Sequence, residues 1–125
     1  MNSIFGSLFI VSTPLGNLKD ITLRALNIMK NSYLIAAEDT RKSKILLNEY
    51  NIMTKMISYH EHNSHNRIKT IISYLKDGKN IALISDAGTP GISDPSYRLI
   101  RSAIENEITV NSIPVSYTHL TLPTN

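Results

Sequence analysis

The chain has 125 residues, of which 42% are hydrophobic and 18% are charged, and this describes one globular domain rather than a disordered tail. No apolar run approaches the roughly 20 residues that a bilayer-spanning helix needs, and the start lacks a secretory signal pattern. A cytoplasmic protein without a membrane partner is therefore expected. The absence of cysteine excludes disulfides, thiolate catalysis and cysteine-ligated zinc, whereas the net charge of +3 permits an anionic partner without requiring one.

Short apolar runs alternate with segments of helical periodicity along the chain. Runs rich in apolar and β-branched residues predict strands at 7–12, 33–37, 55–59, 80–85 and 108–111. Helices are predicted between them: Asp20 can cap the first, Asp77 and Gly78 can end the third, and Pro95 suits the first turn of the fourth.

Strands that alternate with helices indicate the fold class. Parallel neighbours need crossover connections, and helices are the usual crossovers. The chain is therefore predicted to be α/β, with a mostly parallel five-stranded sheet and helices on both faces. Because ligands of such sheets collect beyond the carboxyl ends of the strands, the loops that follow the first four strands are the expected place for chemistry.

The loop after the first predicted strand reads STPLGN over 12–17. A nucleotide-binding loop would occupy this place, but the segment is not GxGxxG and lacks the Gly-Lys-Ser/Thr of a P-loop. A tight turn into the next helix explains the same residues, so the pattern alone leaves both interpretations open.

The loop after the fourth predicted strand reads SDAGTPGISDP over 85–95. Its glycines would let a ligand approach the backbone, its prolines would fix the loop, and Asp86 could accept hydrogen bonds from a ribose or an ammonium group. The alternative is an ordinary loop in which Asp94 caps the next helix. The sequence favours a ligand for 85–89 and a cap for Asp94.

Two further segments carry polar side chains at predicted strand ends. Residues 38–41 (EDTR) place two carboxylates and a guanidinium where a general base or a phosphate-binding arginine would be useful, but Asp39 or Thr40 could equally cap a helix. Residues 60–65 (HEHNSH) suggest a metal by their imidazoles. A bare histidine cluster in a loop is weak evidence, so solvated or substrate-contacting histidines are predicted and no metal is expected.

The last residues, 115–125 (VSYTHLTLPTN), carry no Lys, Arg, Asp or Glu and show no helical period. The string resembles one reading frame of a transposon sequencing adapter. We therefore expect a native domain over 1–114 and a non-native tail over 115–125.

Four ordered segments together resemble the N-terminal half of the small-subunit ribosomal RNA methyltransferase I family, within the tetrapyrrole methylase superfamily: FIVSTPLGNLKDITLRAL, LIAAEDTRKSKILL, SYHEHN and IALISDAGTPGISDPSYRLI. The resemblance implies an S-adenosylmethionine-dependent enzyme that methylates the ribose 2′-hydroxyl of a cytidine in 16S ribosomal RNA. It also implies a second α/β domain across the cofactor cleft and a homodimer when the protein is full length.

The resemblance places cofactor contacts in the loops after the first and fourth strands, at Pro14, Leu15, Gly16, Ile84, Ser85, Asp86 and Thr89. It gives residues 38–41 no proven role. Their chemistry makes Glu38 and Asp39 the candidate catalytic base, with Arg41 and Lys42 contacting RNA phosphate.

The resemblance stops at Pro114, where family members continue into the cleft and the second domain. The second domain is therefore expected to be missing, and the chain alone is expected to be inactive. Three alternatives remain. A tetrapyrrole (corrin/porphyrin) methyltransferase shares the architecture, but the EDTR block belongs to the ribosomal RNA branch of the resemblance and argues against it. A nucleotide-dependent oxidoreductase needs a dinucleotide fingerprint, which is absent after the first strand. A non-catalytic RNA-binding module fits the charge but not the absence of a stacking pair of aromatic residues on a strand.

Overall fold

The structure is a computed structural model that describes residues 4–13, 21–86 and 95–113. Its strands are β1 (Leu8–Thr13), β2 (Leu34–Ala37), β3 (Met56–Ser58), β4 (Ile81–Asp86) and β5 (Val110–Ile113). Its helices are α1 (Leu23–Asn31), α2 (Thr40–Glu49), α3 (Ser64–Lys76) and α4 (Pro95–Glu105). Strands and helices alternate along the chain, as the apolar patterning predicts.

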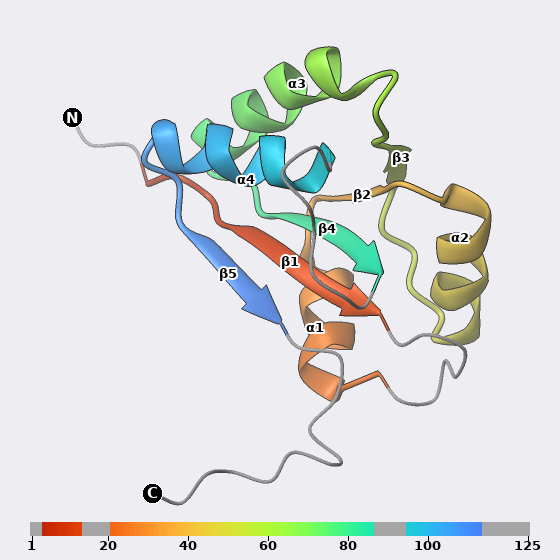
Figure 1. Ribbon diagram of the computed structural model, residues 1–125. Helices are drawn as coiled ribbons and strands as arrows, with labels where there is room; N and C mark the ends of the chain where they lie inside the picture. The colour runs from red at the N-terminus through yellow and green to blue at the C-terminus, as the bar shows by residue number, and fades with distance from the viewer. Residues whose placement is uncertain (1–3, 14–20, 87–94, 114–125) are drawn as a thin grey trace, which may run out of the picture.

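The five strands form one sheet in the order β3-β2-β4-β1-β5, and every neighbouring pair is parallel (Figure 1). The predicted α/β class is confirmed. Because all strands run the same way, their carboxyl ends form a single edge of the sheet, which we call the carboxyl edge.

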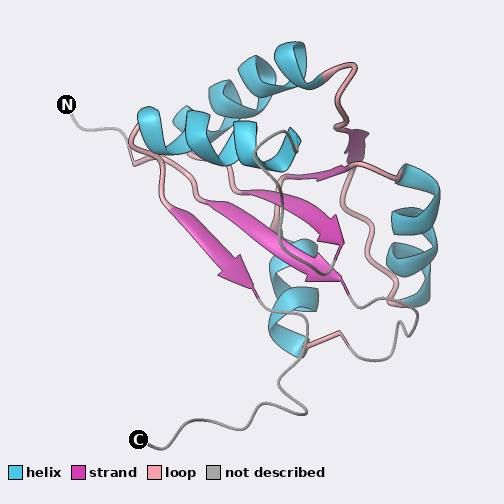
Figure 2. Cartoon of the chain, in the orientation of Figure 1, coloured by secondary structure: helices cyan, strands magenta, loops and turns pink. Residues whose placement is uncertain are grey.

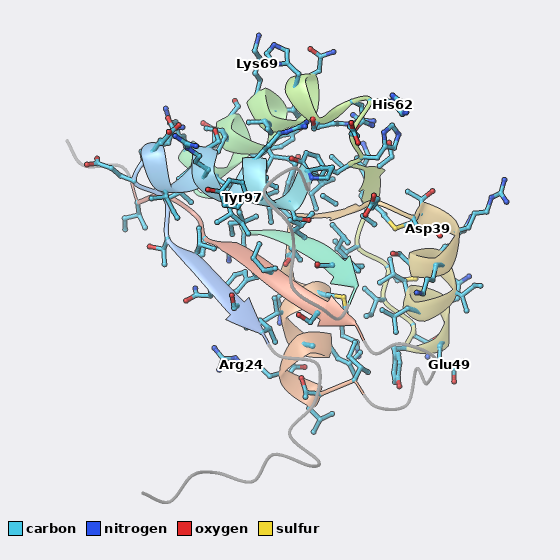
Figure 3. All side chains as sticks on the ribbon, in the orientation of Figure 1. Arg24, Asp39, Glu49, His62, Lys69 and Tyr97 are labelled. Carbon is cyan, nitrogen blue, oxygen red and sulfur yellow. The ribbon has the colours of Figure 1, made fainter. Side chains whose placement is uncertain are left out.

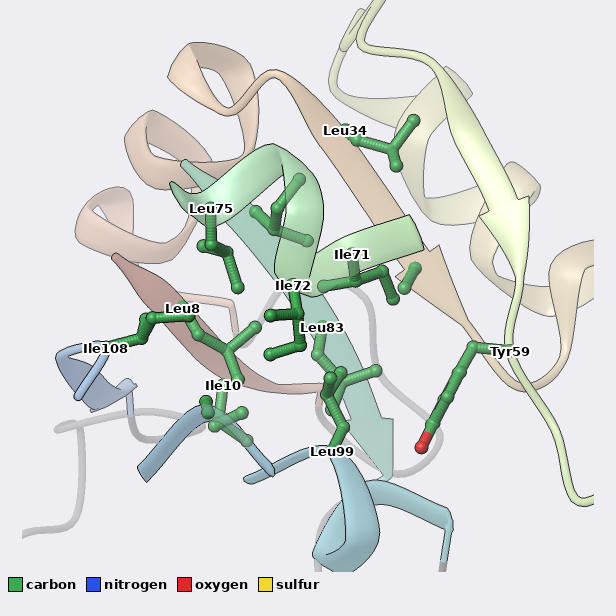
Figure 4. Packing of buried hydrophobic residues seen from close by; sticks show 13 residues of the cluster. Leu8, Ile10, Leu34, Tyr59, Ile71, Ile72, Leu75, Leu83, Leu99 and Ile108 are labelled. Carbon is green, nitrogen blue, oxygen red and sulfur yellow. The ribbon is translucent and has the colours of Figure 1, made fainter. Parts of the chain in front are cut away.

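Helices cover both faces of the sheet (Figure 2), as predicted. Alternate residues of β4 face opposite sides: Leu83 belongs to a core cluster with residues of α3 and α4, and Ile84 to a cluster with residues of α1 and α2. Figure 4 shows the first cluster, in which Ile71, Leu75 and Leu99 are fully buried. Each such side chain contributes about 1.5–3 kcal/mol of burial free energy, so packing fixes the strand ends that carry the site.

The bounds of β1 to β4 differ from the predicted ones by at most one residue, and two differences elsewhere are larger. Helix α1 is capped by Thr22, whose hydroxyl accepts from the Ala25 N–H at 3.1 Å, so the expected Asp20 cap is wrong. Strand β5 begins at Val110, two residues later than expected, because Ile108 packs into the core and Val110 pairs with Leu8. The predicted end of α3 is confirmed: Asp77 is its C-cap, and Gly78 follows with a φ of +90°.

Several predictions concern residues outside the described ranges: the loop at 14–16, Thr89, the cap at Asp94, and the tail at 115–125. They stay predictions. Within the ranges that the structure describes, no helix has the length and apolar character needed to cross a bilayer.

Candidate functional site at the carboxyl edge

The two predicted cofactor loops leave from neighbouring strand ends. β1 and β4 pair along their whole length, with Ser12 opposite Ser85 and Thr13 opposite Asp86. After β1 the chain leads to α1 on one face of the sheet, and after β4 it leads to α4 on the other face (Figure 1). Adjacent strands whose connections leave to opposite faces are where open α/β sheets bind ligands.

The described members of the predicted cofactor set differ in what they offer a ligand. Ile84 is 6% exposed and packs in the core cluster of Val11 and Ile35, so only its backbone is available at the edge. Ser85 is half-buried, and Asp86 ends β4. A ligand at this edge could therefore reach only the main chain of Ile84 and the residues that follow it.

The EDTR segment lies at the end of β2, beside β4 in the sheet. Asp39 is the N-cap of α2: its Oδ1 accepts from the Lys42 N–H at 3.1 Å. The capping interpretation is thus confirmed for Asp39, whose place at the start of α2 is visible in Figure 3. An open pocket of about 550 Å³ is lined by residues 38–41. Glu38 and Arg41 are exposed there, and Glu38 makes no hydrogen bond or ion pair with another described residue.

Tyr59, which directly follows β3, connects three elements of the fold, and the sequence pattern did not predict this role. Its side chain is 1% exposed, and its hydroxyl donates to the carbonyl of Pro95, the first residue of α4. Its N–H donates to the Ala37 carbonyl at 2.8 Å. One residue thus ties β2 and β3 to the start of α4. The available signal was chemical, because a tyrosine buried at a strand end needs a partner for its hydroxyl.

The HEHNSH segment forms a polar corner between β3 and α3. Asn63 organises it: its Oδ1 accepts from the His60 N–H at 2.8 Å, and its Nδ2 donates to Ser58 Oγ at 3.0 Å. The rings of His60 and His62 meet edge to face with centroids 5.8 Å apart. In the described part of the chain, no three His, Asp or Glu side chains come together in a way that could hold a metal ion.

Comparison with known proteins decides the family. The sequence pattern of the tetrapyrrole (corrin/porphyrin) methylases matches residues 7–115. The chain belongs to the tetrapyrrole methylase family. Within this family it is 53% identical over 109 residues to the ribosomal RNA small subunit methyltransferase I of Halalkalibacterium halodurans, and 50% identical over 109 residues to that of Thermotoga maritima. The matches cover 87% of this chain but only 38% and 49% of those relatives.

Solved tetrapyrrole methylases share the fold of this chain. The uroporphyrin-III-C-methyltransferase of Thermus thermophilus superposes with a TM-score of 0.65 at 14% identity, covering 90% of this chain and 48% of that one. The cobalt precorrin-4 methyltransferase CbiF gives a TM-score of 0.66 at 16% identity, covering 88% of this chain and 46% of that one. At these identities the likeness concerns the fold alone.

Proposed function

We propose that this chain supplies the N-terminal domain of an S-adenosylmethionine-dependent methyltransferase that acts on the ribose 2′-hydroxyl of a cytidine in small-subunit ribosomal RNA. The observation that carries the proposal is the 53% identity over 109 residues to a relative named for that ribosomal RNA. A ribosome-modifying enzyme would work in the cytoplasm. The second domain and the homodimer stay predictions for the longer protein, as does the inactivity of the isolated chain.

The described strand ends fit a methyl donor held between the loops after β1 and β4. The half-buried Ser85 offers a hydroxyl there, and the side chain of Ile84, locked in the core, holds the strand end in place. Pro14, Leu15, Gly16, Asp86 and Thr89 complete the proposed set. When bound, S-adenosylmethionine supplies a methyl group that its sulfonium already activates, so positioning the two reactants provides much of the rate.

In this proposal the EDTR segment acts on the ribose of the RNA substrate. Glu38, exposed in the pocket and without a described partner, accepts the 2′-hydroxyl proton as that oxygen forms its bond to the methyl carbon and the carbon–sulfur bond breaks. Asp39 acts by holding the start of α2 through its cap. Arg41, exposed on the first turn of α2, and Lys42 contact RNA phosphate.

The proposal is testable with a chimera in which this chain replaces the matching region of the H. halodurans relative. Small ribosomal subunits from a strain lacking the endogenous enzyme would be incubated with labelled S-adenosylmethionine, and the modified nucleotide identified by mass spectrometry. The expected product is one 2′-O-methylcytidine per 16S RNA. A folded chimera that binds S-adenosylmethionine but leaves the RNA unmodified would contradict the proposal.

A further inference from the structure

The polar corner at the start of α3 holds two buried side-chain nitrogens that have no hydrogen-bond partner among the described residues. Because Asn63 Oδ1 accepts from the His60 N–H, Asn63 Nδ2 is the donor toward His60 Nε2, 3.4 Å away. Nε2 thus has a partner within the corner. Nδ1 is buried and has no hydrogen-bond partner among the described residues, and the same holds for Nε of Arg67.

Two arginines from different helices reach this corner. Arg67 of α3 donates to Ser58 Oγ at 3.4 Å, and Arg98 of α4 donates to Ser64 Oγ at 3.1 Å. Both partners are neutral hydroxyls, and neither arginine forms a salt bridge with a described residue. Arg98 is exposed. By contrast, Arg101, one turn further along α4, pairs with Glu105 at 3.3 Å.

The backbone adds to the same positive field. The first N–H groups of a helix lack intrahelical acceptors, and the helix dipole makes this end positive. Helix α3 starts at Ser64 with no side-chain cap from Asn63 and no acidic residue in its first turn. The nearby Glu61 is exposed and pairs with no described cation. The corner thus joins two guanidinium groups to an uncapped helix start, an arrangement suited to a phosphate.

The corner adjoins the pocket of the EDTR segment. β3 pairs with β2 so that Ser58 lies opposite Ala37, the residue before Glu38. β2 lies between β3 and β4 in the sheet. The carboxyl edge therefore runs from the arginines, through the carboxylates of residues 38–39, to the loops proposed for the methyl donor. In Figure 3, His62 of the corner and Asp39 of the pocket lie along the same side of the molecule.

We propose that Arg67 and Arg98, with the start of α3, bind a backbone phosphate of the RNA strand that flanks the methylated nucleotide. This proposal rests on the proposed function, because the position of the corner beside Glu38 gives the phosphate its role. A phosphate held there fixes the register of the strand while the adjacent ribose enters the pocket of residues 38–41. The two arginines recognise the charge of the phosphate and not the identity of the base.

The test measures binding of a short fluorescein-labelled single-stranded RNA to the 125-residue chain by fluorescence anisotropy. Arg98→Gln is compared with Arg101→Gln, which makes the same charge change on the same helix but away from the corner. We expect Arg98→Gln to weaken binding about tenfold and to reduce the slope of log affinity against log salt by about 0.7. Arg101→Gln should change the affinity less than about twofold, as expected for an exposed pair that is away from the RNA.

A second variant distinguishes a role for the charge of Arg98 in RNA binding from a purely structural role of its side chain. Arg98→Lys keeps the cation and should recover most of the affinity, whereas a purely structural arginine would not be rescued. Thermal unfolding checks that each variant is folded. Equal weakening by Arg98→Gln and Arg101→Gln would overturn the proposal, because net charge alone would then explain binding. Absence of RNA binding by the folded parent chain at millimolar concentration would also overturn it.

The outcomes distinguish this inference from the proposed function. If the chimera methylates small subunits but Arg98→Gln and Arg101→Gln behave alike in RNA binding, the phosphate site is wrong and the methyltransferase proposal stands. If Arg98→Gln selectively loses RNA affinity but the folded chimera transfers no methyl group, the phosphate site stands and the methyltransferase proposal fails.

Discussion

Replacing Tyr59 by phenylalanine removes one hydroxyl and keeps the buried ring. That hydroxyl donates to the Pro95 carbonyl, the contact that ties the end of β3 to the start of α4. The carbonyl lies in the first turn of a helix and retains its intrahelical acceptor role, so it is not orphaned. The loss expected from this contact is therefore that of one net hydrogen bond, about 1 kcal/mol, rather than the larger penalty of an unsatisfied buried group.

A loss of about 1 kcal/mol lowers the midpoint of thermal unfolding by about 3–6 °C for a domain of this size. Circular dichroism on the 125-residue chain measures this shift. Tyr97→Phe is the matched control, because Tyr97 lies on α4 with 37% of its surface exposed and should change stability by less than about 0.5 kcal/mol. Equal midpoints for the two variants would refute the argument that this hydroxyl joins β3 to α4.

Two further substitutions test a close backbone contact before β1 and the cap of α2. Gly6→Ala should destabilise the chain by about 2–3 kcal/mol, because a Cβ at Gly6 would lie 1.8 Å from the Lys79 carbonyl oxygen. Denaturant unfolding measures this loss. The control Ile4→Ala, at a site that is 88% exposed, should leave the stability unchanged. Asp39→Ala should lower the free energy of unfolding by about 1 kcal/mol through loss of the α2 cap. Asp39→Asn keeps a capping oxygen and should lower it less. Equal losses of stability for both variants would contradict the capping role of Asp39.

The sequence predicts the alternation of strands and helices and the placement of helices on both faces of the sheet. It does so because the spacing of apolar residues follows directly from which side chains are buried. The period of Ile68, Ile71, Ile72 and Leu75 predicts the buried face of α3, and three of these four side chains are buried in the core. Boundaries were less predictable. The N-terminus of α1 offers two suitable caps two residues apart, Asp20 and Thr22, and only the position of the helix in the fold selects Thr22.

The site was predictable in part. Ligands collect at the carboxyl ends of parallel strands, and this rule pointed to residues 38–41 and 60–65. In the sheet, these segments follow the neighbouring strands β2 and β3. Sequence spacing could not predict that Arg98 of α4 reaches Ser64 of α3, since the two residues are 34 positions apart. The same holds for Tyr59 and Pro95, whose contact depends on the packing of α4 against the sheet.

Methyl transfer by paired variants of the chimera tests the central claim most directly. Glu38 lies just before the N-cap of α2, Glu49 is the last residue of that helix, and both are exposed. With small ribosomal subunits as substrate, Glu38→Gln should lower the single-turnover rate of 2′-O-methylation by about 10²- to 10⁴-fold, as expected for loss of a general base. Glu49→Gln should leave the rate unchanged. Equal rates for the two variants, or methylation of a tetrapyrrole in place of the ribosomal RNA, would contradict the account.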